Sequence, residues 1–201
     1  MVKTTNNINC LVKIFLETQN QCIKEIKENS LDINEIIKIL ISARKNKKNI
    51  FTMGNGGSGS TASHFVSDLL KTMIIKNENR FKAISLVDNI PVILAWSNDV
   101  SFDHIFIEQL KNHLEKGDIV IAFSGSGKSK NVVDALRFAK KKGAKCIGFT
   151  GKQGGYFNKV CDITYKVPSN DMLTIESQHM TICHCIASAI RNLGSPMFHY
   201  D

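Results

Sequence analysis

Histidines and carboxylates occur at helical spacing in two parts of the sequence. His64 and Asp68 are four residues apart within a helical pattern, so they share one face of that helix. Glu176 and His184 are eight apart in a second helical pattern and lie on roughly one stripe. Two imidazoles and two carboxylates on separate helices can close a tetrahedral zinc site, or move a proton as base and acid. Taken singly, each has a simpler explanation, because a lone helical histidine is more often packed or exposed and Glu176 suits the first turn of a helix.

The chain contains two loops rich in glycine and serine. The first glycine loop, residues 54–60 (GNGGSGS), and the serine loop, residues 124–129 (SGSGKS), each follow an apolar run and precede a helical pattern. Free N–H groups at helix starts attract anions at this edge of a parallel sheet, and neighbouring hydroxyls suit a phosphate monoester. Helix capping and turn formation are the alternative use of these residues. Neither loop matches the dinucleotide or P-loop pattern, so nucleotide binding has no support.

Apolar runs and helical patterns alternate along the chain. The apolar runs cover residues 49–53, 82–86, 118–123, 145–149 and 163–167. The helical patterns cover residues 7–28, 33–46, 60–72, 91–96, 102–114, 131–142 and 172–192. Strands separated by helices predict an α/β fold with a doubly wound, flavodoxin-like parallel sheet of five strands.

The length of 201 residues and the lack of a linker or low-complexity stretch predict a single domain over residues 1–201. Two helical patterns within residues 1–48 precede any strand. Their apolar faces are larger than the domain needs, which suits packing on the domain and on neighbouring subunits. Covering one end of the chain's own sheet is the alternative.

The composition is that of an ordinary globular protein, with 43% hydrophobic and 22% charged residues. Lysines are spread along the whole chain, so we interpret the net charge of +8 as a solvated surface rather than a nucleic-acid site. No apolar run reaches membrane-spanning length and residues 1–9 lack signal-peptide organisation, so we expect a cytoplasmic protein without a membrane partner.

The six cysteines form no CxxC pair, and we expect reduced thiols. Cys183 and Cys185 point to opposite sides of a helix, so both cannot share a metal with His184.

Several stretches together resemble one known family. The residues Ser124-Gly125-Ser126-Gly127, followed by Asn131-Val132, resemble the phosphosugar loop of the SIS (sugar isomerase) domain. Residues 51–58 (FTMGNGGS), 62–65 (ASHF), 98–99 (ND), 149–155 (FTGKQGG) and 179–184 are similar, more narrowly, to the sedoheptulose 7-phosphate isomerases, or phosphoheptose isomerases. The resemblance covers nearly the whole chain.

The resemblance implies a fold, a reaction and a set of site residues. It implies an SIS-domain homotetramer that converts sedoheptulose 7-phosphate to a heptose 7-phosphate for bacterial lipopolysaccharide or capsule, with zinc in the active site. The residues implied to bind the sugar phosphate are Asn55, Gly56, Gly57, Ser58, Asn98, Asp99, Ser124, Gly125, Ser126 and Ser129. The implied metal ligands are His64, Asp68, Glu176 and His184, and we predict Asp68, Glu176 and His184 as the catalytic residues.

The chain departs from the family at two of these positions. Asp68 stands where the best-known members have a glutamate, and Glu176 stands where glutamine is usual. Shortening a base by one methylene displaces it, and a neighbouring carboxylate can compensate by supplying charge or basicity. Two alternatives stay open: a non-catalytic phosphosugar-binding SIS protein that acts through a protein partner, and an isomerase of another phosphosugar.

Overall fold

The protein folds around a five-stranded parallel sheet, as the sequence predicts. The computed structural model describes residues 2–28 and 30–199. Within them the sheet has the order β2-β1-β3-β4-β5, and every neighbouring pair is parallel. The strands are β1 (Asn49–Gly54), β2 (Lys82–Ser85), β3 (Ile119–Phe123), β4 (Lys145–Thr150) and β5 (Ile163–Lys166). This order places the ends of β1 and β3 side by side, and with them the two glycine-containing loops that follow these strands.

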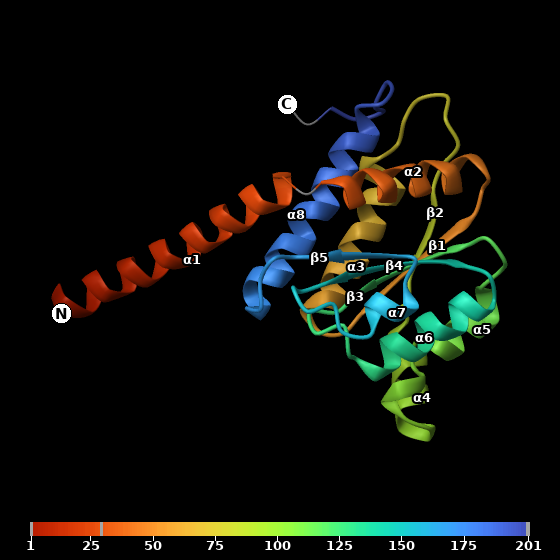
Figure 1. Cartoon of the computed structure of the whole chain (residues 1–201). Helices are drawn as coiled ribbons and strands as arrows, with labels where there is room; N and C mark the ends of the chain where they lie inside the picture. Colours follow the sequence, from red (N-terminus) through yellow and green to blue (C-terminus); the bar gives the residue numbers. More distant parts are fainter. Residues whose placement is uncertain (1, 29, 200–201) are drawn as a thin grey trace.

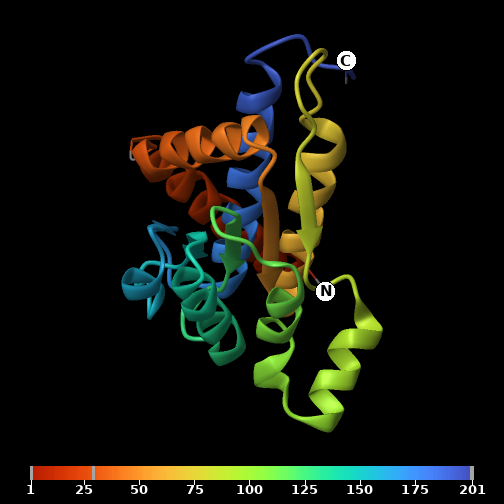
Figure 2. The same cartoon turned by 90° about the vertical axis from the view of Figure 1, so that its right-hand side faces the viewer.

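Alternate side chains along the strands belong to two hydrophobic layers, one on each face of the sheet. Along β3, Ile119, Ile121 and Phe123 belong to the first layer, whereas Val120 and Ala122 belong to the second. The first layer is closed by α2 (Leu31–Lys45), α3 (Gly57–Ser67) and α8 (Met172–Arg191). The second is closed by α5 (Ile107–His113), α6 (Lys130–Lys141) and α7 (Phe157–Val160) (Figures 1 and 2). Because both faces are covered, the central strand β3 is apolar and buried throughout, as in a doubly wound fold.

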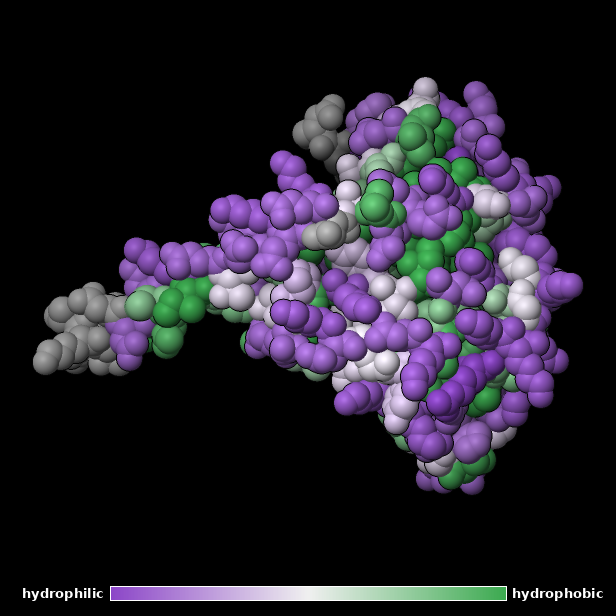
Figure 3. All heavy atoms as spheres, in the orientation of Figure 1, coloured by the Kyte–Doolittle hydropathy of each residue, from purple (hydrophilic) through white to green (hydrophobic). Residues whose placement is uncertain are grey.

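Two helices extend away from this body. Helix α1 (Val2–Glu28) projects to the left in Figure 1, and α4 (Ile90–Asp99) protrudes at the bottom of the same view. Near its C-terminal half, α1 is tied to α8 because the Gln19 amide donates to the Thr174 hydroxyl and the Gln178 amide donates to Gln19. The projecting part of α1 carries exposed apolar side chains, visible in Figure 3. These are Ile8, Leu11, Val12, Ile14, Phe15 and Leu16. None of the described helices is long and apolar enough to cross a membrane.

The structure differs from the predicted helices in three places. The pattern over residues 102–114 is broken into a short 3₁₀ turn, η2 (Phe102–His104), and α5. The pattern over residues 60–72 ends as a π-helical turn, η1 (Asp68–Thr72), in which the Met73 N–H bonds to the Asp68 carbonyl. Helix α7 was not predicted. A single turn of 3₁₀ or π-helix shifts side chains by too little to disturb an apolar pattern over one turn, so spacing alone did not reveal these features.

Candidate active site

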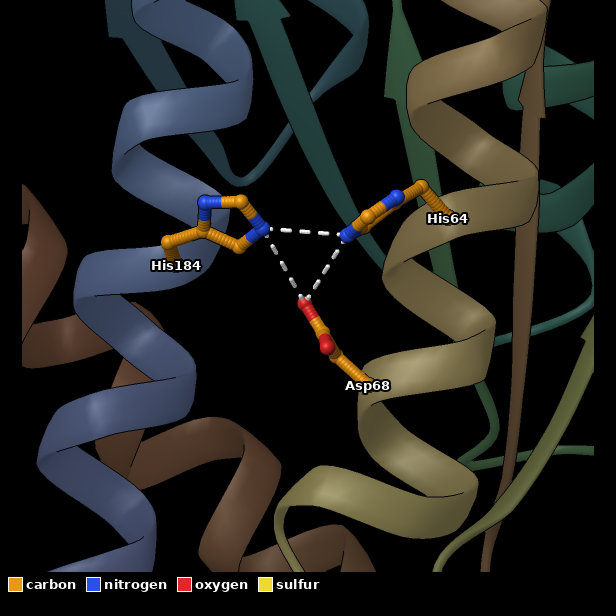
Figure 4. Close-up of side chains that lie close together, drawn as sticks. All are labelled: His64, Asp68 and His184. Atoms are coloured by element: carbon orange, nitrogen blue, oxygen red, sulfur yellow. Dashed lines mark hydrogen bonds and ion pairs between the residues drawn. The ribbon is translucent and has the colours of Figure 1, made fainter. Parts of the chain in front are cut away.

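Three of the four predicted metal-ligating side chains converge between α3 and α8. The Nε2 atoms of His64 and His184 lie 3.0 Å apart, although 120 residues separate them in the chain. The Asp68 Oδ2 atom lies 3.7 Å from the His64 Nε2 and 3.8 Å from the His184 Nε2. Figure 4 shows the three side chains pointing toward one another across the gap between the two helices. We call this group the histidine–aspartate triangle.

The triangle combines a buried carboxylate with two accessible imidazoles. The Asp68 side chain is only 10% exposed, whereas those of His64 and His184 are 47% and 56% exposed. Among the described residues, the buried Asp68 Oδ2 has no hydrogen-bond partner. A buried carboxylate oxygen without a donor is costly, so the site favours an added positive charge at its centre.

The three ligand atoms also suit a metal ion. Zinc–nitrogen and zinc–oxygen bonds of about 2.0–2.1 Å in a tetrahedral site place neighbouring ligand atoms about 3.3 Å apart. The edges of the triangle, 3.0, 3.7 and 3.8 Å, lie on either side of that length. Three protein ligands with one open position are typical of a catalytic rather than a structural zinc site. The histidine–aspartate triangle can therefore hold a metal ion.

The packing of α3 against α8 positions the triangle. Phe65 and Leu69 on one side, and Ile182 and Ile186 on the other, are buried in the layer that the two helices share. Asp68 begins the π-helical turn, and such turns often occur at functional sites. The Cys183 side chain is fully buried and its thiol pKa is raised well above the usual value, first by burial and then by the nearby Asp68 carboxylate. Cys185 is exposed, so the two cysteines point to different sides, as predicted.

Glu176 lies outside the triangle. Its carboxylate occupies the space that a side chain on Gly57, the first residue of α3, would need, so a larger residue there would displace Glu176. Half-buried there, the carboxylate faces the start of a helix, where free N–H groups favour negative charge. Sequence spacing placed Glu176 and His184 on one stripe, but eight residues of helix separate them by about 12 Å along the axis.

The serine loop has the shape of an anion cradle. The hydroxyls of Ser124 and Ser129 lie 3.1 Å apart, and the exposed Ser126 hydroxyl accepts a bond of 3.2 Å from the Lys128 N–H. The Gly125 carbonyl accepts bonds from the Thr150 hydroxyl and the Gly151 N–H, which hold the loop against the end of β4. Beside the loop is a cavity of about 230 Å³ lined in part by Ser126, Lys128 and Lys152.

The first glycine loop opens into a larger cavity that reaches the triangle. This cavity, about 670 Å³, is lined on its polar side by Asn55, Gly56, Ser60, Ser63, His64 and Asp88. Ser58 is buried and lines neither this cavity nor the smaller one. Sequence reasoning missed Ser60, Ser63 and Asp88, whose only signal was their place in or after strand-end loops.

Asn98 and Asp99 are two further predicted sugar-binding residues that line neither cavity. They lie exposed at the end of the protruding helix α4, where the Asn98 amide donates to the Asp99 carboxylate over 2.8 Å. Within one chain they contact neither loop cavity. The sequence could not indicate this, because α4 is largely apolar and yet none of its residues is buried within one chain.

Comparison with known proteins gives consistent results. A family model described as "SIS domain" matches residues 14–151. A relative from Aliarcobacter butzleri named "Phosphoheptose isomerase" is 37% identical over 183 residues, which are 90% of this chain and 96% of the relative. A solved phosphoheptose isomerase from Francisella tularensis is 30% identical, has a TM-score of 0.83, and covers 90% of this chain and 96% of its own. A phosphoheptose isomerase from Neisseria gonorrhoeae, 24% identical with a TM-score of 0.82, shares the fold over 90% of this chain and 97% of its own.

Proposed function

Since this chain belongs to the SIS-domain family, among its phosphoheptose isomerases, it is an aldose–ketose isomerase, and we propose that it converts sedoheptulose 7-phosphate to D-glycero-D-manno-heptose 7-phosphate through a cis-enediol. The product would feed nucleotide-activated heptose for lipopolysaccharide or capsule. The observation that carries the proposal is the histidine–aspartate triangle, which lies on the same cavity as the first glycine loop. A module that only bound a phosphosugar would have little use for it.

Isomerisation moves a proton between two adjacent carbons while the neighbouring oxygen gains and loses charge. We assign His64, Asp68 and His184 to the place where that oxygen is stabilised. Zinc bound by these residues would polarise the substrate carbonyl as a Lewis acid. Asp68 and His184 are catalytic in this scheme because they face the reacting oxygen.

Glu176 is our candidate for the base that moves the proton between the carbons. Its carboxylate is half-buried at Gly57, beside the cavity-lining residue Gly56, and is free of the histidine–aspartate triangle. A carboxylate here can accept a proton from one carbon and return it to the next without leaving its position. This role explains why a charged glutamate stands where the family usually has glutamine.

Substrate binding divides between the two loops. We assign the phosphate to Ser124, Ser126 and Ser129 with the backbone of Gly125, since these hydroxyls belong to one loop, two of them lie 3.1 Å apart, and α6 begins directly after Ser129. The sugar is assigned to the first glycine loop, where Asn55 and Gly56 line the larger cavity and Gly57 and the buried Ser58 support them from behind. Asn98 and Asp99 are exposed on α4, so we assign them to a sugar bound by a neighbouring subunit.

We propose a cytoplasmic homotetramer. The support is the row of exposed apolar side chains on α1, together with Ile90, Leu94, Val100 and Phe102 on and beside α4. Apolar surface of this extent usually lies in a subunit interface.

The test is incubation of the purified protein with sedoheptulose 7-phosphate, with and without a chelator, followed by analysis of the sugars. We expect conversion to the heptose 7-phosphate and its loss in chelator. Binding of the sugar phosphate without any conversion would replace the proposal by the non-catalytic alternative. Faster conversion of a five- or six-carbon ketose phosphate would show that the shorter sugar phosphate, and not sedoheptulose 7-phosphate, is the substrate.

A further inference from the structure

We infer that Asn131 is a positioning residue that holds the first glycine loop and the serine loop at a fixed separation, through a paired hydrogen bond with Asn55. The inference rests on the proposed function, because it concerns a substrate whose two ends bind at different loops.

The pair is a reciprocal amide contact between residues 76 apart in the sequence. The Asn55 Nδ2 donates to the Asn131 Oδ1 over 3.0 Å, and the Asn131 Nδ2 donates to the Asn55 Oδ1 over 2.9 Å. The Asn131 Oδ1 also accepts the Val132 N–H over 2.9 Å. Because that N–H requires an acceptor, it fixes which way the Asn131 amide faces, and Asn131 in turn orients Asn55.

The two asparagines stand at the starts of the two helices that carry the site. Asn131 is the second residue of α6, two positions after Ser129, and Asn55 precedes Gly56, which has a positive φ of 54° and leads into α3. Helix α3 then runs to His64, about 10 Å along the axis from its first residue. The pair therefore constrains the separation between the serine loop and the start of the helix that carries His64. A misplacement of about 1 Å between reacting groups can lower a rate a hundredfold.

Burial makes Asn131 the cleaner residue to test. It is 2% exposed, so it acts through Asn55 and the loop backbones rather than by touching the substrate. Asn55 is half-buried and lines the cavity, so a change there also alters a cavity wall.

The experiment compares Asn131→Ser, Asn55→Ser and the double variant with the wild type. Serine at position 131 keeps an acceptor near the Val132 N–H but is too short to reach Asn55. For each protein, turnover of sedoheptulose 7-phosphate, affinity for that sugar phosphate at isomerisation equilibrium, affinity for inorganic phosphate, and Tm are measured. Asn46→Ser, at the end of α2 and remote from both loops, is the matched control.

We expect Asn131→Ser to weaken sugar-phosphate binding at least about tenfold while inorganic phosphate, which needs only the serine loop, binds within about twofold of wild type. The double variant should lose no more than the more impaired single variant, because both substitutions break the same contact. The control variant, Asn46→Ser, should keep the wild-type turnover and both wild-type affinities. Additive losses, or equal losses for sugar phosphate and inorganic phosphate, would overturn the inference, and so would unchanged sugar-phosphate binding in Asn131→Ser.

Failure of the inference and failure of the proposed function give different results. A wild type that binds but does not convert the sugar phosphate refutes the function, and the two affinities still test the pair. An active wild type with unaltered affinities in the variants refutes the pair alone. If the wild type binds no sugar phosphate, both are refuted.

Discussion

Helix α8 carries two histidines, five residues apart, in opposite environments. His184 is half-exposed and faces His64 and Asp68 across the gap to α3. His179 has no exposed surface and its ring lies against those of Phe123 and Phe149, with centroids 5.9 and 6.0 Å away. Burial lowers the His179 pKa to about 4, against a smaller opposing effect of the Thr150 backbone, so that ring is neutral at physiological pH. The comparison teaches that the helix face, and not the residue type, separates a histidine for chemistry from one for packing.

The largest expected effect follows from removing the accessible histidine. His184→Ala should lower kcat by about a thousandfold, because it removes one side of the triangle, and should leave Tm nearly unchanged. His179→Leu should retain activity within about tenfold, since its ring contacts the core and not the triangle. Steady-state kinetics and thermal unfolding of both variants test this contrast. Comparable activity in the two variants would remove the distinction between the two faces of α8.

The next effect concerns acid stability. His179 has a folded pKa of about 4 and an ordinary value of 6.5, so between these values the unfolded chain binds more protons than the folded one. Stability from this group is therefore full above about pH 6.5 and falls as the pH drops toward 4, by about 3 kcal/mol. Denaturant unfolding of wild type and His179→Leu across this range measures it. A wild-type slope that persists unchanged in His179→Leu would place the proton uptake elsewhere.

A smaller effect is expected at the carboxylate that faces His184. Asp68→Asn removes a buried charge without a hydrogen-bond donor, so the metal-free variant should be more stable than wild type by about 1 kcal/mol. The same change should weaken metal binding by at least about tenfold. Chelator-treated samples of both proteins, compared by denaturant unfolding and then by zinc titration, test both parts. Loss of stability in the metal-free variant would mean that the charge is already compensated in the apo protein.

The smallest effect is expected next to His184 in sequence. Cys185→Ser should change neither activity nor metal affinity, because Cys185 is exposed and lies outside the triangle. Kinetics and zinc titration of this variant check it. Weakened zinc binding would bring a thiol into the metal site and contradict the assignment of the three ligands.

The fold was predictable from the sequence, and part of the site was. Apolar runs such as residues 118–123 predicted the positions of the strands. The glycine-rich loops after two of these strands predicted the sheet edge at which a ligand binds. Both signals are local in the sequence. Helical spacing placed His64 and Asp68 on one face, whereas their meeting with His184 was implied only by the family resemblance. Spacing could not place Glu176 at Gly57, pair Asn55 with Asn131, or separate Asn98 and Asp99 from the cavities, because these depend on contacts between segments far apart in the chain. Spacing alone also does not distinguish His179 from His184, and only its contacts with Phe123 and Phe149 identify His179 as part of the core.

We propose that the face of α8 bearing His184 holds a metal ion that the isomerisation needs. The most direct measurement is zinc titration of chelator-treated protein with sedoheptulose 7-phosphate turnover followed at each step. The account predicts that turnover rises to a plateau at about one zinc per chain in wild type and in His179→Leu, and stays near zero in His184→Ala. Full turnover by the metal-free wild type, or restoration of turnover by zinc in His184→Ala, would show that the isomerisation does not need a metal ion bound by His184.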